Sequence, residues 1–280
     1  MTRRACVIGY PVAHSRSPLI HGYWLREHQI DGDYVRHEVR PEAIDDFLKN
    51  FPASGFVGCN VTLPHKEAAA RNVADARPVV RALGVANTLW LEGGKLHADN
   101  SDVIGFLAHL DDSFPGWPVN TKHAVILGAG GAARAVAYGL KERGVDRITI
   151  VNRSRGRAQQ LIAETKIDAS TAEFDQLPEL LPSADLLVNT TSLGMKGQPV
   201  LEIDLKSLKA GAAVCDVVYV PLETELLKKA RERGHPTVDG LGMLLHQAVV
   251  GFERWFGVKP KVTPELRAHI VADLIKSDAQ

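Results

Sequence analysis

Apolar positions recur along the chain with two different spacings, and segments of the two kinds alternate from one end to the other. Runs typical of strands lie at residues 5–9, 34–39, 56–61, 85–91, 95–98, 124–127, 147–151, 185–189, 213–217 and around 237. Patterns typical of helices lie at residues 18 onward, 41–50, 100–110, 132–143, 157–165, 239–256 and 263–275. This alternation predicts an α/β protein with mainly parallel sheets, apart from a hairpin around Glu92, Gly93 and Gly94.

The apolar run at 124–127 leads directly into a glycine-rich turn, and a helical pattern follows. Glycine at 128 permits a tight turn, and glycine at 130 lets backbone amides approach a pyrophosphate at the helix N-terminus. The third glycine of the usual fingerprint is replaced by Ala133. A turn without a ligand is the plainer interpretation, but the strand–turn–helix context favours a dinucleotide site. Its expected residues are Gly128, Ala129, Gly130, Gly131 and Ala132.

The next apolar run ends in Asn152, Arg153 and Ser154, and Arg157 follows in the expected helix. An NAD enzyme typically carries an acidic residue here, which accepts a hydrogen bond from the ribose 2′-hydroxyl. Guanidinium groups instead bind phosphate in bidentate fashion. The set favours NADP over NAD, and it disfavours a methyltransferase because S-adenosylmethionine has no 2′-phosphate. Taken alone, the arginines are also compatible with a solvated helix start.

Composition excludes some partners. The chain has 280 residues, and its 33 Lys and Arg equal its 33 Asp and Glu, so no net field attracts nucleic acid or an anionic membrane. Cys6, Cys59 and Cys215 each lie in an apolar run, and we expect them to be buried and reduced. The N-terminus has no signal-peptide pattern, and no apolar run is long enough to cross a bilayer. We therefore expect a cytoplasmic protein.

Seven blocks resemble signatures of the shikimate dehydrogenase family and occur in that family's order. They are 9–21 (GYPVAHSRSPLIH), 60–66 (NVTLPHK), 84–89 (GVANTL), 99–106 (DNSDVIGF), 189–195 (NTTSLGM), 216–221 (DVVYVP) and 240–248 (GLGMLLHQA). The departures are Ala98 for a usual glycine, Ser101 for a usual threonine, and the Ala132-Ala133 end of the nucleotide loop. The resemblance implies an NADP-dependent oxidoreductase that interconverts 3-dehydroshikimate and shikimate by reversible hydride transfer, in aromatic amino acid (chorismate) biosynthesis.

The resemblance implies that Ser15 and Ser17 bind the substrate carboxylate. Two hydroxyls and a helix N-terminus at Pro18 can hold an anion without a buried cation. Taken alone, Ser17 is better interpreted as the N-cap of that helix, with Pro18 at its first position. Hydroxyls at both positions also favour shikimate over quinate-type substrates.

The resemblance places Lys66 and Asp102 beside the reacting hydroxyl. Oxidation of an alcohol requires removal of its proton as the hydride leaves, and a lysine can carry that proton in either direction. A carboxylate at Asp102 would orient the lysine and bind a substrate hydroxyl. Taken singly, Lys66 is compatible with an exposed helix start and Asp102 with a favourable charge at a helix N-terminus. Whether Lys66 carries the proton or acts mainly as an electrostatic binder is open.

Further residues are expected around the two ligands. The resemblance implies a polar cage around the substrate, made by Asn60, Thr62, Asn87, Tyr219 and Gln247. A structural hydrogen bond is the alternative for each, evenly balanced for Asn60 and Tyr219. The resemblance also implies that Thr190, Met195, Gly240 and Met243 contact the cofactor, although core packing explains the methionines equally well. His14 and His65 have no partners at ligand spacing, so we expect no metal and interpret both as structural or rim residues.

The pattern is interrupted at 111–122 by two prolines and a glycine, and a βαβ rhythm restarts at His123. We expect an N-terminal α/β substrate domain (1–106 plus 241–280), a Rossmann-type NADP-binding domain (107–240), and a cleft between them that holds the active site. The alternatives are a quinate or aminoshikimate dehydrogenase and a catalytically silent NADP-binding regulator. The expected partner is a small-molecule substrate, and a monomer and a homodimer are equally open.

Overall fold

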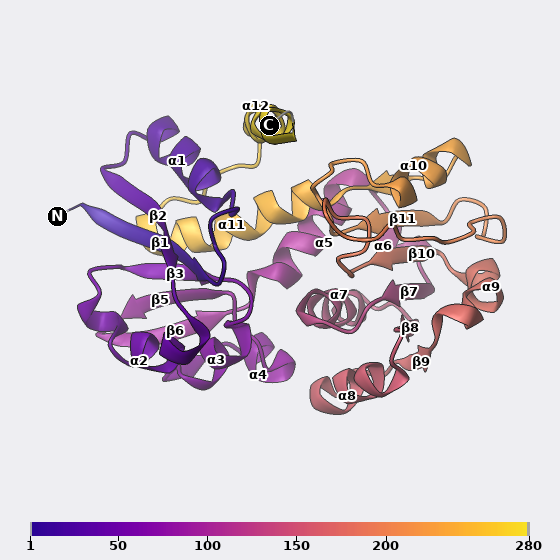
Figure 1. Cartoon of the computed structure of the whole chain (residues 1–280), viewed down its shortest axis with the longest axis horizontal. Coiled ribbons are helices and arrows are strands. Elements are labelled where there is room, and N and C mark those ends of the chain that lie inside the picture. The colour runs from indigo at the N-terminus through magenta and orange to yellow at the C-terminus, as the bar shows by residue number, and fades with distance from the viewer. Residues whose placement is uncertain (1, 279–280) are drawn as a thin grey trace. The chain divides into compact units, whose positions relative to one another are not determined.

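The structure, a computed structural model, describes residues 2–278, which divide into two compact units. Unit 1 runs up to Ser101 and resumes at Leu245, and unit 2 comprises Asp102–Leu244. Each division falls inside a helix, α5 (Ser101–Ser113) or α11 (Gly240–Phe256). Both units combine a sheet with helices, which confirms the predicted α/β class (Figure 1).

Unit 1 contains a six-stranded mixed sheet in the order β2-β1-β3-β5-β6-β4. Its strands are β1 (Arg3–Gly9), β2 (Gly32–Glu38), β3 (Gly58–Val61), β4 (Asp75–Ala76), β5 (Thr88–Glu92) and β6 (Lys95–Asp99). The strand β1 runs parallel to β2 and β3, whereas β5 is antiparallel to β3 and forms the predicted hairpin with β6. The helices of this unit are α1 (Ser17–Glu27), α2 (Ile44–Lys49), α3 (Lys66–Arg71), α4 (Pro78–Leu83) and α12 (Pro264–Asp278). The 3-10 turns are η1 (Pro41–Ala43) and η2 (Phe51–Ala53).

The two faces of this sheet bury different side chains. Cys6, Cys59 and Leu89 lie in one core cluster with residues of α2, α3 and α4. On the other face α11 approaches β3 closely, because Gly58 has no side chain. A Cβ there would lie 2.0 Å from Nε1 of Trp255, whose indole N–H donates to the carbonyl of Leu89 at 2.9 Å.

A buried histidine lies on that second face. The ring of His21, in α1, stacks on Tyr34 of β2 with 4.0 Å between ring centroids, and neither of its nitrogens has a hydrogen-bond partner of acceptable geometry. Burial lowers the pKa of His21 to about 3, and the Asn60 side chain beside it opposes this shift only in part. The imidazole is therefore neutral at physiological pH.

Unit 2 contains a six-stranded, wholly parallel sheet in the order β12-β11-β10-β7-β8-β9. Its strands are β7 (His123–Leu127), β8 (Arg147–Val151), β9 (Ser170–Ala172), β10 (Leu186–Asn189), β11 (Ala213–Asp216) and β12 (Thr237–Val238). Counted from β7, this is the strand order of the Rossmann fold. The order reverses between β7 and β10, and ligands of such sheets bind outside the carboxyl ends of the strands at that point.

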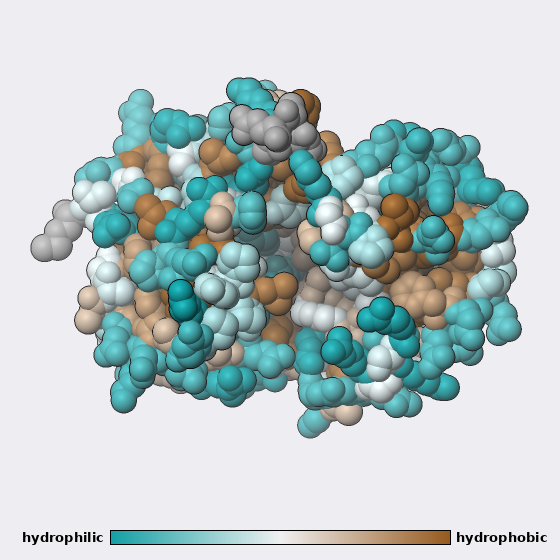
Figure 2. Space-filling model, viewed as in Figure 1, coloured by the Kyte–Doolittle hydropathy of each residue, from teal (hydrophilic) through white to brown (hydrophobic). Residues whose placement is uncertain are grey.

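Helices cover the parallel sheet. They are α6 (Trp117–Asn120), α7 (Gly131–Glu142), α8 (Arg155–Thr165), α9 (Leu177–Leu180) and α10 (Glu225–Glu232), with 3-10 turns η3 (Phe174–Gln176) and η4 (Leu181–Ser183). Leu226 and Leu227 of α10 pack in one core cluster with Val125 and Leu187 of the sheet. Hydrophilic side chains dominate the visible face of each unit (Figure 2), as expected when the apolar residues fill the cores.

Two general expectations can be compared with the described residues. Cys6, Cys59 and Cys215 are free and buried. Within 2–278, none of the helices is both long and apolar enough to cross a bilayer. The 41–50 segment is less regular than predicted, because a 3-10 turn (η1) precedes the short α2.

Candidate functional site

The Ser15 and Ser17 hydroxyls lie together at the start of α1. The hydroxyl of Ser15 donates to Oγ of Ser17 at 3.2 Å, and the backbone N–H of Ser17 donates to Oγ of Ser15 at 3.3 Å. The structure corrects the N-cap interpretation of Ser17: Arg16 is the capping residue, its side chain makes no capping hydrogen bond, and Ser17 is the first helical residue.

Asn60, at the end of β3, is hydrogen-bonded to the protein at both ends of its amide. Its Oδ1 accepts from the Tyr34 hydroxyl at 2.6 Å. Its Nδ2 donates to the carbonyl of Asn87 at 3.3 Å and to Oγ1 of Thr88 at 3.4 Å. These contacts support the structural alternative for Asn60. The contacts also identify Tyr34 and Thr88 as supporting residues. The sequence did not indicate this role, because both lie on strands other than β3, which carries Asn60.

Ser101 joins three elements of unit 1. Its backbone N–H and hydroxyl donate to Oδ1 of Asn87 at 2.7 and 3.1 Å. Its hydroxyl oxygen also lies 2.9 Å from that of Thr88 and 3.2 Å from Oε1 of Gln247. The fully buried Ser101 therefore fixes the start of α5 to β5 and α11. The departure from the family's usual threonine thus falls at the centre of this network.

The starts of α3 and α5 are attached to one short segment. Lys66, half-buried, is the first residue of α3, and its carbonyl accepts from the N–H of Ala86 at 2.9 Å. The next residue, Asn87, holds Ser101, and Asp102 follows with 8% of its surface exposed. Residues 86 and 87 therefore bond the first residue of α3 and the first residue of α5.

The neighbouring loop is also fixed by hydrogen bonds. The N–H of Thr62 donates to Ile8 at 2.9 Å, and its carbonyl accepts from His65 at 3.0 Å. The buried His65 ring lies 2.7 Å from the carbonyl of Val39, which is a structural contact, whereas His14 is exposed. Among residues 2–278, the His, Cys, Asp and Glu side chains form no group of three that could hold a metal ion.

The glycine-rich turn of unit 2 lies at the point where the strand order reverses. Gly128, after β7, has φ of +106°, and a Cβ there would lie 2.9 Å from Oγ1 of Thr190, the residue after β10. That hydroxyl donates to the carbonyl of Leu127 at 2.6 Å. Conformation and space thus both require glycine at 128. Around Gly130 and Gly131 a Cβ would meet nothing within 4 Å, and no side chain caps α7. The open space above an uncapped helix start fits a pyrophosphate.

The start of α8 presents a cluster of exposed positive charge. Arg153 and Arg157 are exposed, and residues 152–157 include no acidic side chain. Asn152 donates from Nδ2 to the carbonyl of Ser154 at 2.9 Å, which shapes the turn after β8. Arg155, between the two arginines, donates to Oγ1 of Thr171 at 3.3 Å. The guanidinium groups of Arg153 and Arg157 fit a 2′-phosphate beside the ribose.

Asp216, at the end of β11, joins the loops that carry other predicted residues. Its carboxylate accepts from Nδ2 of Asn189 at 2.9 Å, from the N–H of Val218 at 3.0 Å and from the Thr224 hydroxyl at 2.8 Å. Burial raises its pKa to about 6, although these donors act in the opposite direction. The half-buried Tyr219 and the more exposed Met195 lie on the two loops that Asp216 holds.

The start of α11 packs tightly on the loop after β11. A Cβ on Gly240 would lie 2.3 Å from the carbonyl oxygen of Val217. Met243, one turn further along, is half-buried. The predicted cofactor residues of unit 2 therefore lie on the turns after β7, β8 and β10 and at the start of α11.

The buried charge of Asp216 makes a testable pH dependence. Because the pKa of Asp216 is raised in the native state, the native state is most stable, as far as this group is concerned, below the ordinary pKa of 3.8, where the carboxyl group is neutral. This stability is lost as the pH rises through about 6 and the buried group becomes charged. Asp216→Asn keeps the shape without the charge. The difference in free energy of unfolding between the variant and the wild type should be about 1.5 kcal/mol more favourable to the variant at pH 7.5 than at pH 5.

Urea unfolding at the two pH values measures this shift. Asp168→Asn is the control, because the Asp168 side chain is 91% exposed. Equal differences between variant and wild type at pH 5 and pH 7.5 would contradict a buried, destabilised carboxylate at 216.

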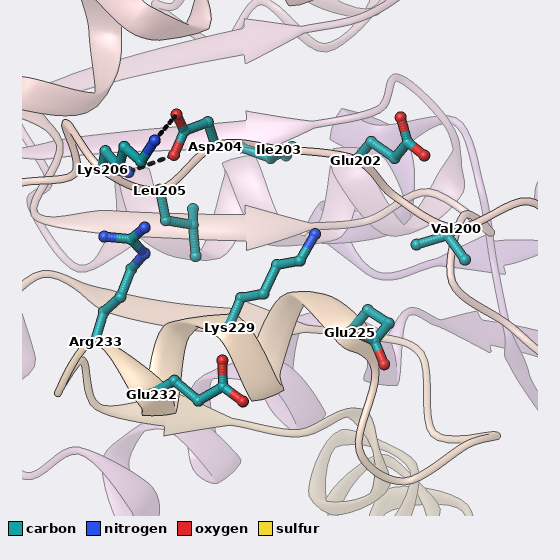
Figure 3. Close-up of a pocket in the computed structure, with 10 residues that line it drawn as sticks. All are labelled: Val200, Glu202, Ile203, Asp204, Leu205, Lys206, Glu225, Lys229, Glu232 and Arg233. Atoms are coloured by element: carbon teal, nitrogen blue, oxygen red, sulfur yellow. Dashed lines mark hydrogen bonds and ion pairs between the residues drawn. The ribbon is translucent and has the colours of Figure 1, made fainter.

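A pocket of about 850 Å³ lies elsewhere on unit 2 (Figure 3). Its lining residues are Val200, Glu202, Ile203, Asp204, Leu205, Lys206, Glu225, Lys229, Glu232 and Arg233. Side chains of both charges surround it, and Lys206 pairs with Asp204 at 3.8 Å. None of the predicted site residues lines this pocket.

Three family models match the chain. The model described as the shikimate dehydrogenase substrate binding domain matches residues 7–89. The shikimate / quinate 5-dehydrogenase model matches residues 111–220, and the shikimate 5′-dehydrogenase C-terminal domain model matches residues 240–264.

Similar proteins match over nearly the whole length. A protein from Azorhizobium caulinodans named shikimate dehydrogenase (NADP(+)) is 56% identical over 272 residues, 97% of each chain. One of the same name from Methylobacterium radiotolerans is 56% identical over 276 residues, 98% of each chain.

Solved structures also match. The shikimate 5-dehydrogenase of Thermus thermophilus, in complex with NADP(H) and shikimate, has a TM-score of 0.86 and 33% identity, covering 98% of this chain and 100% of that one. The quinate dehydrogenase of Corynebacterium glutamicum, in complex with NAD, has a TM-score of 0.89 and 29% identity, covering 97% and 99%.

Proposed function

The chain belongs to the shikimate dehydrogenase family, and we propose that it is an NADP-dependent member that interconverts 3-dehydroshikimate and shikimate in aromatic amino acid biosynthesis. The observation that carries the proposal is a combination within one chain. Paired serine hydroxyls at the start of α1 suit a small carboxylate, and a Rossmann turn is followed by exposed arginines that suit a 2′-phosphate.

We assign the substrate to residues 1–106 plus 241–280 and the dinucleotide to residues 107–240. Ser15 and Ser17 bind the carboxylate, because their hydroxyls lie together at the N-terminus of α1. The hydroxyls of the ring are bound by polar side chains of Thr62, Asn87, Tyr219 and Gln247. Asn60 acts mainly by holding Tyr34, Asn87 and Thr88 in place.

In the proposed mechanism Lys66 exchanges a proton with the oxygen on C3 of the substrate. When bound, NADPH supplies the hydride that reduces C3 of 3-dehydroshikimate. Lys66 donates its proton to the C3 oxygen in that direction and accepts it in the reverse direction. Asp102 orients the ammonium group and accepts from a neighbouring substrate hydroxyl.

The dinucleotide is held by the turns of unit 2. Backbone amides of residues 128–132 would hold the pyrophosphate, and Asn152, Ser154, Arg153 and Arg157 would hold the 2′-phosphate and the adenine side. Thr190, Met195, Gly240 and Met243 would lie at the nicotinamide end. The free, buried cysteines support a cytoplasmic location for the protein.

An initial-rate assay tests the proposed function against its nearest alternative. Shikimate and quinate are each offered with NADP and with NAD, and reduced cofactor is followed by its absorbance. The values of kcat/KM are compared, because specificity is a ratio of such efficiencies. We expect the highest value for shikimate with NADP, since hydroxyls at 15 and 17 favour shikimate and the arginines at 153 and 157 favour NADP. The likeness to a quinate dehydrogenase in complex with NAD makes quinate with NAD the competing outcome. Dinucleotide binding without any turnover would indicate a silent regulator.

A further inference from the structure

Strand β2 presents two polar side chains to the loop that carries Ser15 and Ser17. Tyr34 and Arg36 are two residues apart on β2, so they share one face of the strand. The buried Tyr34 hydroxyl donates to Oδ1 of Asn60 at 2.6 Å and lies beside the side chain of Ser17. Arg36 donates from Nε and Nη2 to the carbonyl of Ser15 at 3.0 and 2.6 Å. Strand β2 therefore holds the loop at Ser15 through Arg36, and Tyr34 of the same strand lies beside Ser17.

The two arginines near this loop differ in their electrostatic state. Arg16, within the loop, lies 2.8 Å from Oδ2 of Asp273, so a carboxylate neutralises it. Arg36 is exposed, and among the described residues it has a neutral carbonyl and no carboxylate as its partner. Its charge is therefore not compensated within the described part of the chain.

The contact of Arg36 also fixes the loop. Two N–H donors that converge on one acceptor fix the position of the Ser15 carbonyl oxygen. The same residue carries the side chain whose hydroxyl is bonded to Ser17. A shift of the Ser15 carbonyl would therefore move the pair of hydroxyls.

We propose that Arg36 is a positioning residue for carboxylate binding: it fixes the Ser15 peptide through two hydrogen bonds and adds an uncompensated positive charge behind the serine hydroxyls. The inference rests on the proposed function, since it concerns the same substrate carboxylate. Arg36 acts through Ser15 and takes no part in proton or hydride transfer.

Steady-state kinetics of shikimate oxidation with NADP test this role. For Arg36→Met we expect the KM for shikimate to rise about 10-fold, because a charge and two charge-assisted hydrogen bonds are lost together. The kcat and the KM for NADP should stay within twofold of the wild type. Arg36→Lys should recover part of the loss, because it restores the charge and one donor.

The methyl ester of shikimate separates this role from a general structural one. Without a substrate carboxylate, the expected change in KM on Arg36→Met falls below twofold. Arg81→Met is the matched control, because Arg81 is also exposed in unit 1 and also donates to a backbone carbonyl, that of Ala76. This variant should resemble the wild type with both substrates.

The contradicting results are specific. An unchanged KM for shikimate in Arg36→Met, or an equal loss with shikimate and its ester, overturns the role of Arg36 while the proposed function stands. If the wild-type protein itself does not oxidise shikimate with NADP, the proposed function fails first, and the inference about Arg36 fails with it.

Discussion

Replacing Lys66 by alanine is expected to lower kcat for shikimate oxidation by about 10³-fold, while the KM for shikimate rises less than about fivefold. A positioned proton carrier acts mainly in the transition state, because the alcohol proton leaves only as the hydride departs. The half-buried start of α3 holds this lysine beside the segment that fixes α5. Stopped-flow and steady-state rates on the purified variant measure both parameters.

A second variant distinguishes the two roles left open for this lysine. Lys66→Arg keeps the positive charge but cannot release a proton near neutral pH. If Lys66 carries the proton, the arginine variant loses nearly as much kcat as the alanine variant. If it acts mainly as an electrostatic binder, much of the activity returns. Lys49→Ala, at the exposed end of α2, is the control. Turnover of Lys66→Ala near that of the wild type would remove this residue from catalysis.

Removing two guanidinium groups is expected to change the cofactor preference. In the double variant Arg153→Ser, Arg157→Ala the KM for NADP should rise at least about 100-fold, because each of the two charge-assisted phosphate contacts contributes about 1.5 kcal/mol or more. The KM for NAD should change less than threefold, because NAD has no 2′-phosphate. Initial rates with both cofactors at saturating shikimate give this comparison.

The chain offers a matched control within the same helix start. Arg155 lies between the two arginines but donates to Thr171, so Arg155→Ala should leave the KM for NADP within about twofold. An equal rise in KM for NADP and NAD in the double variant would contradict a phosphate-specific role and would indicate a general disturbance of the turn.

Much of the fold follows from local pattern. The parallel strands of unit 2 are buried on both faces and are therefore continuous apolar runs, which predicts them well. The glycine turn after β7 and the family's sequence blocks also lie in continuous segments, so their place in the sheet could be expected. Short elements such as β4, β9 and α9 escaped prediction, because two to four residues are too few to show a period.

The supporting residues of the site could not be predicted in the same way. Arg36 supports a loop some twenty residues earlier in the chain, and Tyr34 donates to Asn60 on β3; both contacts depend on how β2, β1 and β3 pair. Asp216 looks like one residue of a family block, and only the fold shows that it joins Asn189 and Thr224. Local sequence predicts which residues carry chemistry, whereas the contacts that position them depend on long-range packing.

The most direct test of the account follows a labelled hydrogen. Wild-type protein is given 3-dehydroshikimate with NADPH carrying deuterium at C4, each face labelled in turn, and the shikimate formed is examined by NMR and mass spectrometry. The account predicts one deuterium at C3 of shikimate from one of the two labelled cofactors, and none at C3 when unlabelled NADPH is used in D₂O. Shikimate whose C3 hydrogen comes from solvent, or no shikimate at all, would contradict direct hydride transfer by this protein.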